Sequence, residues 1–356
     1  MVATVVVVVL GGVTWLAAVN RKSHSAEKTG VRLLVASSAA PARVGIFTLD
    51  GGTVSAVRGI PAGGCPVGNV FRIQGTEKWA LTSQQPNSGS QPCDSAAGGI
   101  YVVDAVALTA RWIGSAQGIA AADRSSLWTV SGVDLQPAQE LVGYEIVQRV
   151  SLTGAALSPV YALPVGWAVI KGLTPDLLLL ARDQGAGSDN YEAWQPSTGR
   201  VLGQYERVFA ANASVVVWVN TACAPDNCPV HLSAPASGTD RTVSLPAGAY
   251  AYDGSLSDDG TYLALSLGTA ADTQGATDQD SGVIVEMASR VVHLIPQTKV
   301  PASETGSLSL NWAARGWLLV STPGPNATSQ LAAYNPTTGA FVVAQHIPPT
   351  DEYAVV

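Results

Sequence analysis

The feature that most constrains the fold is a short apolar segment that recurs at intervals of roughly 40 to 55 residues. Each copy is four to six residues long and rich in Leu, Val and Trp, which suits a buried strand better than a helix. Seven copies occur, at Leu33–Ala36, Trp79–Thr82, Leu127–Val130, Leu177–Ala181, Val215–Val219, Tyr262–Leu267 and Trp317–Ser321. This period indicates a repeat architecture.

A second pattern follows most copies: an apolar or aromatic strand, a small polar turn containing Gly, and a further strand. Examples are Val44–Leu49 before Asp50-Gly51-Gly52 and Leu331–Tyr334 before Pro336-Thr337-Thr338-Gly339. Gly supplies the positive φ that such hairpins need. Another strand can be drawn ahead of most copies, for example at Val70–Ile73. Four strands in about 45 residues is the size of one blade of a β-propeller.

The sequence therefore predicts an all-β chain whose residues 31–356 form a single β-propeller of about seven four-stranded blades. Charged residues make up only 13% of the chain against about 25% in an average soluble domain, and turn formers are abundant, both of which favour strands. A pair of β-sandwich domains is the alternative fold. The first unit lacks a leading strand and the chain ends with a spare one, so we expect Glu352–Val356 to close the ring in the first blade.

One repeat carries a motif. The segment Ser257-Asp258-Asp259-Gly260-Thr261-Tyr262-Leu263-Ala264 resembles the S-x-D-G-x-x-L-A signature of TolB-type and WD-repeat-like propellers. In those families the Asp-Gly pair makes a tight turn into the next strand. The spacing of the blades behind an apolar N-terminus is also similar to that of membrane-anchored actinobacterial propeller proteins. The resemblance implies a fold and a location but no functional residues.

The N-terminal run Val2–Val19 is uncharged and apolar over eighteen residues, the length of a membrane-spanning helix. We expect residues 1–20 to be a transmembrane anchor or a signal peptide and residues 21–30 a juxtamembrane linker, with the propeller in an extracytoplasmic space. Arg21 and Lys22 follow the run and no basic residue precedes it, which by the positive-inside rule points the other way.

Four cysteines support the extracytoplasmic prediction, because an even number behind a secretory-type N-terminus indicates disulfides. Local pairing of Cys65 with Cys93 and of Cys223 with Cys228 is the favoured connectivity among three. A zinc site at Cys223, Cys228 and His231 is the competing interpretation, although it offers only three ligands. The other histidines are scattered, at His24, His293 and His346.

No nucleophile-elbow, phosphate-loop or dinucleotide motif is present in the sequence, so no catalytic or cofactor-binding residue and no cofactor is predicted. A glycosidase would need two carboxylates brought together, and the candidates at strand ends are Asp104, Asp134, Asp183, Asp189 and Glu192. Asp272, Asp278 and Asp280 form a weak Ca²⁺ candidate in a polar loop. Inter-blade packing is expected for most tryptophans, and a sugar-stacking surface is the alternative, at Trp79, Trp112, Trp128, Trp167, Trp194, Trp218, Trp312 and Trp317.

Two functions follow from these patterns. The first is a non-catalytic binding or scaffold module at the cell envelope, a monomeric propeller with an envelope protein as its partner. The second is an extracytoplasmic, carboxylate-dependent enzyme acting on glycans or a related polymer. Sensing of a metal or small ligand is a third possibility. Nucleic acid is excluded as a partner, because the net charge is −7 and no basic patch occurs.

Overall fold

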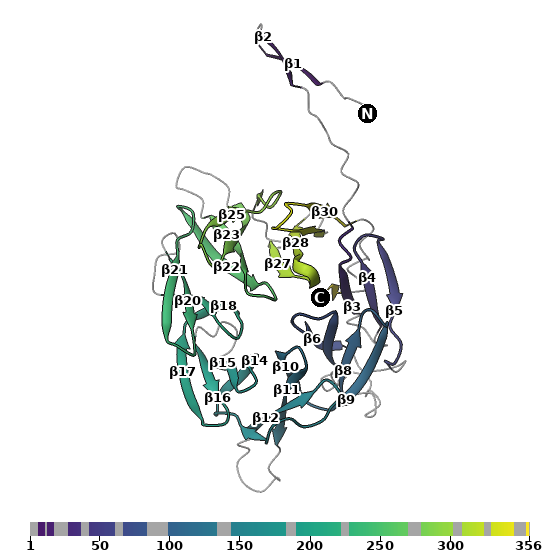
Figure 1. Cartoon of the computed structure of the whole chain (residues 1–356), viewed down its shortest axis with the longest axis vertical. Helices are drawn as coiled ribbons and strands as arrows, with labels where there is room; N and C mark the ends of the chain where they lie inside the picture. Colours follow the sequence, from purple (N-terminus) through teal and green to yellow (C-terminus); the bar gives the residue numbers. More distant parts are fainter. Residues whose placement is uncertain are drawn as a thin grey trace, which may run out of the picture.

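The computed structural model describes residues 6–10, 13–17, 28–36, 43–60, 67–83, 99–133, 144–182, 190–221, 228–269, 279–301, 308–323, 329–344 and 354–355. Seven antiparallel sheets are arranged in a ring around a common centre (Figure 1). We number these sheets blade 1 to blade 7 in chain order. The all-β, seven-bladed propeller predicted from the repeat is confirmed.

The innermost strand of each blade, in blade order, is β31 (Ala354–Val355), β6 (Val67–Arg72), β10 (Gly118–Asp123), β14 (Trp167–Thr174), β18 (Arg207–Ala211), β22 (Ala249–Leu256) and β27 (Ser309–Trp312). The second strands are β3 (Arg32–Ala36), β7 (Lys78–Ser83), β11 (Ser126–Val133), β15 (Leu177–Arg182), β19 (Val216–Val219), β23 (Tyr262–Thr269) and β28 (Leu318–Pro323). These are the seven predicted apolar segments.

The third strands are β4 (Val44–Thr48), β8 (Gly99–Asp104), β12 (Tyr144–Ser151), β16 (Tyr191–Gln195), β20 (Val230–Ala234), β24 (Gln279–Glu286) and β29 (Ser329–Tyr334). The outer strands are β5 (Thr53–Ala56), β9 (Thr109–Gly114), β13 (Tyr161–Ala162), β17 (Arg200–Tyr205), β21 (Thr239–Val243), β25 (Val292–Leu294) and β30 (Phe341–Val343). Blade 6 departs from the predicted four strands, because β26 (Val300–Pro301) adds to the start of β24. A short 3₁₀ turn, η3 (Ala314–Gly316), joins β27 to β28.

The second strands are apolar along their whole length because neighbouring blades cover both of their faces. In β7, Trp79 and Leu81 pack against blade 1, whereas Ala80 between them packs against blade 3. A buried cluster of this kind fills each of the seven junctions between blades. The core of the molecule is thus divided among the junctions, and each blade is stabilised by its two neighbours.

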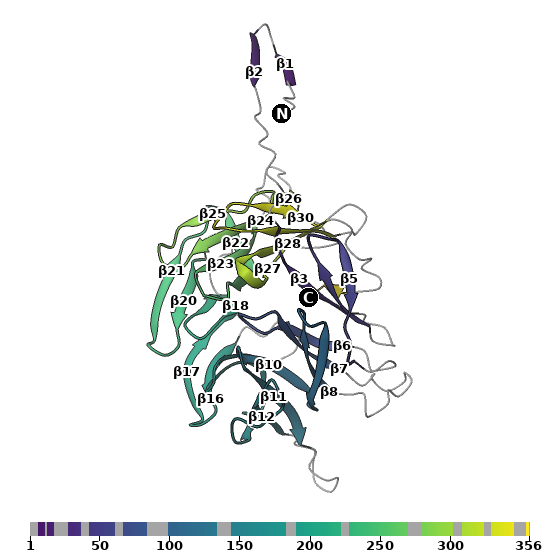
Figure 2. The same ribbon diagram turned by 45° about the vertical axis from the view of Figure 1, so that its right-hand side comes forward.

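The ring is closed by the last strand. Ala354 and Val355 of β31 pair antiparallel with Ala36 and Val35 of β3, so the two ends of the propeller share blade 1. The C-terminus lies beside β3 in both views (Figures 1 and 2). The predicted closure is confirmed.

The helix expected near the N-terminus is not found there. Val6–Leu10 (β1) and Val13–Ala17 (β2) pair instead as an antiparallel hairpin, in keeping with the strand preference of β-branched valines. Among the described residues no helix is long and apolar enough to cross a membrane. Attachment to a membrane by this segment stays a prediction.

Candidate functional site

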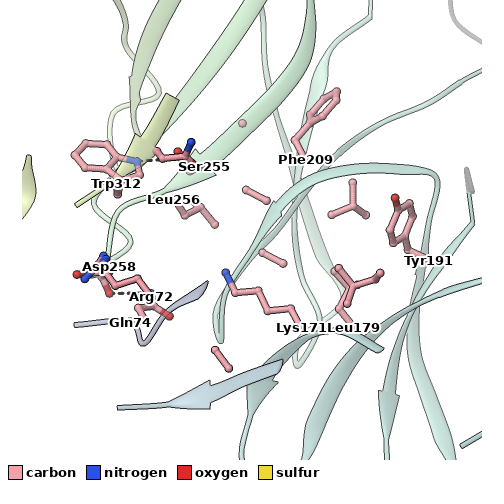
Figure 3. A pocket seen from close by; sticks show the side chains of 17 residues that line it. Arg72, Gln74, Lys171, Leu179, Tyr191, Phe209, Ser255, Leu256, Asp258 and Trp312 are labelled. Atoms are coloured by element: carbon pink, nitrogen blue, oxygen red, sulfur yellow. Dashed lines mark hydrogen bonds and ion pairs between the residues drawn. The ribbon is translucent and has the colours of Figure 1, made fainter. Parts of the chain in front are cut away.

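The inner strands of six blades surround a cavity of ≈ 350 Å³ at the centre of the ring. Its apolar wall includes Ile170, Leu179, Phe209, Leu256 and Trp312, and its charged groups among the described residues are Arg72, Lys171 and Asp258. Figure 3 shows the Lys171 side chain reaching into the cavity between the Arg72–Asp258 pair and the aromatic rings of Tyr191 and Phe209. We call this cavity the channel site.

Lys171 stands in the channel because of the register of β14. The strand reads Trp167 to Thr174 with Lys171 as its one charged residue, and a bulge between Val169 and Lys171 interrupts its pairing with β15. Burial lowers the pKa of the Lys171 ammonium, the Asp258 carboxylate opposes this shift, and Arg72 adds to it. No described carboxylate lies within ion-pair distance of Lys171.

Arg72 and Asp258 face each other across the same space. Arg72 Nη2 donates to Asp258 Oδ1 at 2.5 Å, and Arg72 Nη1 donates to the carbonyl of Thr76 at 3.0 Å. Gln74 Nε2 donates to the backbone carbonyl of Asp258 at 3.0 Å. The one described carboxylate of the channel site, Asp258, is therefore already paired with Arg72. Lys171 is the remaining, uncompensated positive charge of the site.

At the rim of the channel, the ion pairs of Glu77 connect neighbouring blades. Glu77, in the turn between β6 and β7, accepts hydrogen bonds from Arg315 of blade 7 at 2.7 Å and 3.0 Å. It also pairs with Arg32 of blade 1. Glu77 thus links three consecutive blades, and both of its oxygens are engaged.

The carboxylates proposed for a glycosidase are not brought together where the structure describes them. Asp104 accepts the backbone N–H groups of Val106 and Ala107 at 3.0 Å and 2.9 Å, an ordinary turn role. Glu192 accepts from Gln204, its partner across β16 and β17, at 2.9 Å. Asp104 lies in blade 2 and Glu192 in blade 4. Asp134, Asp183 and Asp189 lie outside the described residues.

The structure describes only some of the residues proposed as metal ligands. Asp272 and Asp278 lie outside the described residues, while Asp280 is buried at the start of β24 and hydrogen-bonds to Tyr252. Within the described ranges no group of three His, Cys, Asp or Glu residues could hold a metal ion. His231 has other partners: its Nδ1 lies 2.7 Å from Asp240, and its ring stacks on Trp218 at 4.3 Å between centroids. His293 is exposed on β25, and His24 and His346 fall outside the description.

Three of the four cysteines, Cys65, Cys93 and Cys223, also fall outside the described residues. The predicted disulfides, Cys65 with Cys93 and Cys223 with Cys228, therefore stay predictions.

The tryptophans serve mostly in packing, as expected. Trp79, Trp128, Trp194, Trp312 and Trp317 are buried between blades, and Trp112 is the exception, with 55% of its surface exposed. Trp167 and Trp218 line a cleft of ≈ 330 Å³ between blades 4 and 5 together with Tyr191 and Tyr205. Trp218 is already stacked on His231 and donates its Nε1 hydrogen to Ser233 at 2.8 Å.

Sequence reasoning missed the charged groups of the channel site. Asp258 stood in the motif that resembles TolB-type propellers, at the unspecified position before the Asp259-Gly260 turn, and was given no role. A signal for Lys171 was present: it directly follows Trp167–Ile170, which is one of the further strands that can be drawn ahead of the apolar copies. A side chain of such a strand points either into the packing between blades or into the central channel, and a charged side chain is expected in the channel.

No protein-family profile and no curated protein sequence matches the chain. Solved structures do match in fold. One of two prolyl endopeptidases studied together has a TM-score of 0.60 at 13% identity, over 92% of this chain and 49% of that one. A candidate 6-phosphogluconolactonase from Bacteroides fragilis has a TM-score of 0.51 at 12% identity, over 94% of this chain and 100% of that one.

TolB from Acinetobacter baumannii matches with a TM-score of 0.43 at 14% identity, over 92% of this chain and 66% of that one. At such identities the likeness concerns the fold alone. The chain is a seven-bladed β-propeller, similar in fold to peptidase and lactonase-like propellers.

Proposed function

We propose that this chain is a non-catalytic binding propeller of the cell envelope whose channel site binds an acidic segment of a partner protein. The observation that carries the proposal is the Lys171 ammonium, which faces the cavity without a carboxylate partner among the described residues. An anionic group placed beside it would supply the missing charge and restore the proton affinity that burial has lowered.

The charge of the site contrasts with the charge of the chain. The described lining carries two cations, Arg72 and Lys171, against one carboxylate, Asp258, whereas the whole chain has a net charge of −7. A local positive field in an acidic protein favours an anionic ligand at that place and disfavours it elsewhere. The apolar wall of Phe209, Leu256 and Trp312 provides contact area for neighbouring side chains of the segment.

The binding role is favoured over the glycan enzyme by the state of the carboxylates. A glycosidase needs one carboxyl to act as an acid and another as a base or nucleophile, about 5 to 10 Å apart. Asp258, Glu77, Asp104 and Glu192 are each already engaged with an arginine, a turn or a glutamine. The envelope location rests on the sequence: the apolar first 20 residues, the four cysteines and the membrane-anchored propellers that the chain resembles.

The proposal is tested with fluorescent peptides that differ only in charge. The full chain should bind an Asp/Glu-containing hexapeptide more tightly than its Asn/Gln counterpart, and added salt should weaken this binding. Lys171→Met should weaken acidic-peptide binding about tenfold, corresponding to roughly 1.4 kcal/mol, and Lys171→Arg should retain most of it. Equal binding of the acidic and neutral peptides, or undiminished binding by Lys171→Met, would rule the proposal out.

The partner itself is sought by crosslinking the tagged full-length protein in cells and identifying what co-purifies from solubilised membranes. One or two envelope proteins captured by the wild type and lost with Lys171→Met support the proposal. Turnover of a defined polysaccharide by the purified chain would instead favour the enzyme.

A further inference from the structure

Lys171 carries a nitrogen nucleophile that a small molecule can reach. The channel site has a volume of ≈ 350 Å³, within the range of small-molecule sites, and Lys171 is one of its lining residues. The residue is partly exposed, and Figure 3 shows its Nζ directed away from β14 and into the cavity. A molecule that enters the channel site therefore meets the nitrogen atom.

The surroundings of this nitrogen disfavour its charged form. Leu179 and Phe209 line the same cavity, and their side chains offer an ammonium no hydrogen-bond acceptor. The Arg72 guanidinium lines it as well and repels a second cation. Asp258 attracts the ammonium, but it is paired with Arg72 and lies beyond ion-pair distance of Lys171.

The balance of these effects lowers the pKa of the Lys171 amine, with burial as the main cause. Tyr191 is the remaining titratable residue of the described lining, and a phenol adds no charge near neutral pH. At a given pH, more of Lys171 is therefore present as the neutral amine than of a solvent-exposed lysine. The neutral amine is the nucleophilic form, and apolar surroundings and a neighbouring cation both activate a lysine in this way.

We propose that Lys171 binds carbonyl compounds covalently, by forming an imine with an aldehyde that has an apolar body. The nitrogen lone pair makes the new bond to the carbonyl carbon. The carbonyl oxygen leaves as water with the two hydrogens of the amine, so the step needs no oxidant or reductant. Phe209, Leu256 and Trp312 line the cavity and provide apolar contact area for the body of the aldehyde.

This inference concerns the cavity of the proposed peptide site but does not rest on peptide binding. Peptide binding uses the charge of Lys171, whereas imine formation uses its lone pair. Lys171→Arg separates the two, because a guanidinium keeps the charge and does not lose its proton.

The probe is benzaldehyde, incubated with the full chain and sodium cyanoborohydride at pH 7. The reagent adds hydride to the imine carbon and leaves a stable secondary amine, which mass spectrometry of proteolytic peptides assigns to one residue. The lysines to be compared are Lys22, Lys28, Lys78, Lys171 and Lys299.

Lys78 is the internal control within the same sample. Its side chain is 42% exposed, and its Nζ lies 3.7 Å from Asp104 Oδ2, so it is open to solvent and beside a carboxylate. We expect Lys171 to be labelled at least about tenfold faster than Lys78, the ratio that one unit of pKa gives in neutral amine. Labelling of Lys171 at or below the rate of Lys78 would overturn the proposal.

The pH dependence tests the cause of the reactivity. The ratio of the two labelling rates should fall as the pH rises toward 10.5, the ordinary pKa of lysine, because exposed lysines then become neutral as well. A ratio that stays constant over this range would contradict the activation of Lys171 by its surroundings.

Acetaldehyde tests the apolar wall, because it has the reactive group of benzaldehyde without the ring. The preference for Lys171 over Lys78 should be at least about threefold smaller with acetaldehyde. Equal preferences for the two aldehydes would show that the wall selects no apolar body.

Lys171→Arg should lose the label in the channel, keep the label on Lys78 and still bind the acidic peptide. A wild-type chain that binds this peptide without being labelled at Lys171 would fail the present inference alone. A chain that is labelled at Lys171 but binds acidic and neutral peptides equally would fail the proposed function alone.

Discussion

Arg72 and Asp258 form an ion pair at 2.5 Å although 186 residues separate them in the chain. Arg72 ends the innermost strand of blade 2, and Asp258 follows that of blade 6. The two side chains are only 14% and 23% exposed. The ring is therefore held across its centre as well as around its circumference.

Breaking this pair should destabilise the propeller. Asp258→Asn leaves the Arg72 guanidinium half-buried with no counter-charge, and we expect a loss of about 1–3 kcal/mol in the free energy of unfolding. Urea unfolding of Asp258→Asn, Arg72→Met and the double variant gives the coupling energy. A coupling below about 0.5 kcal/mol would show that the pair contributes little across the channel.

Gly172 allows the inner strands of blades 3 and 4 to approach closely. A Cβ at this position would lie 2.2 Å from the carbonyl oxygen of Ala121 and 2.8 Å from Trp128 Cδ1. Gly172→Ala must push backbone apart, and we expect a cost of about 2–4 kcal/mol. Gly118→Ala on β10 is the control, because its Cβ would meet Val130 at an ordinary 3.5 Å. Similar thermal unfolding of the two variants would refute the close-approach argument.

Removal of residues 352–356 tests the closure of blade 1. Without β31, the backbone of Val35 and Ala36 loses its inner partner and blade 1 keeps only β3, β4 and β5. We expect a fall in the melting temperature of about 5 °C or more. An unchanged melting temperature after the deletion would mean that the ring holds without this strand.

The pH dependence of stability should report on Lys171. Its pKa in the folded chain lies below the ordinary value of 10.5, chiefly through burial. Between the folded value and 10.5 the unfolded chain binds more protons, so this residue makes stability rise with pH across that window. Lys171→Met removes the slope and should be at least as stable as the wild type at neutral pH. Parallel stability curves for the two proteins up to pH 10 would contradict the assigned environment.

The blades were predictable because each second strand is buried on both faces. Such a strand needs apolar residues at consecutive positions, as in Leu177–Ala181, and these segments can be recognised in the sequence. The closing strand followed from counting strands per repeat. The extra strand β26 did not, because Val300–Pro301 pairs over only two residues and leaves no periodic pattern. The apolar N-terminal run was expected to be a helix, whereas its described parts Val6–Leu10 and Val13–Ala17 pair as strands, and length and hydropathy alone do not separate a valine-rich strand pair from a helix.

The channel site could not be assembled from the sequence. Arg72, Lys171 and Asp258 come from three blades, and only the closure of the ring sets the distances between them. The two buried donors without an acceptor, Trp79 Nε1 and Arg72 Nε, were equally hidden. Trp79 was correctly predicted to pack between blades, but whether its N–H meets an acceptor depends on the neighbouring backbone, which composition and spacing do not specify.

The pairing of β31 with β3 also sets the order in which the molecule can be completed during synthesis. Blades 2 to 7 each draw their strands from one continuous stretch of chain, so each can form soon after that stretch leaves the ribosome. Blade 1 cannot be completed in this way, because β3 is synthesised before the strands of the other blades and its inner partner β31 after them. Until then, the inner edge of β3 is an open strand edge in a nascent chain, and open edges of this kind are prone to pair with other chains.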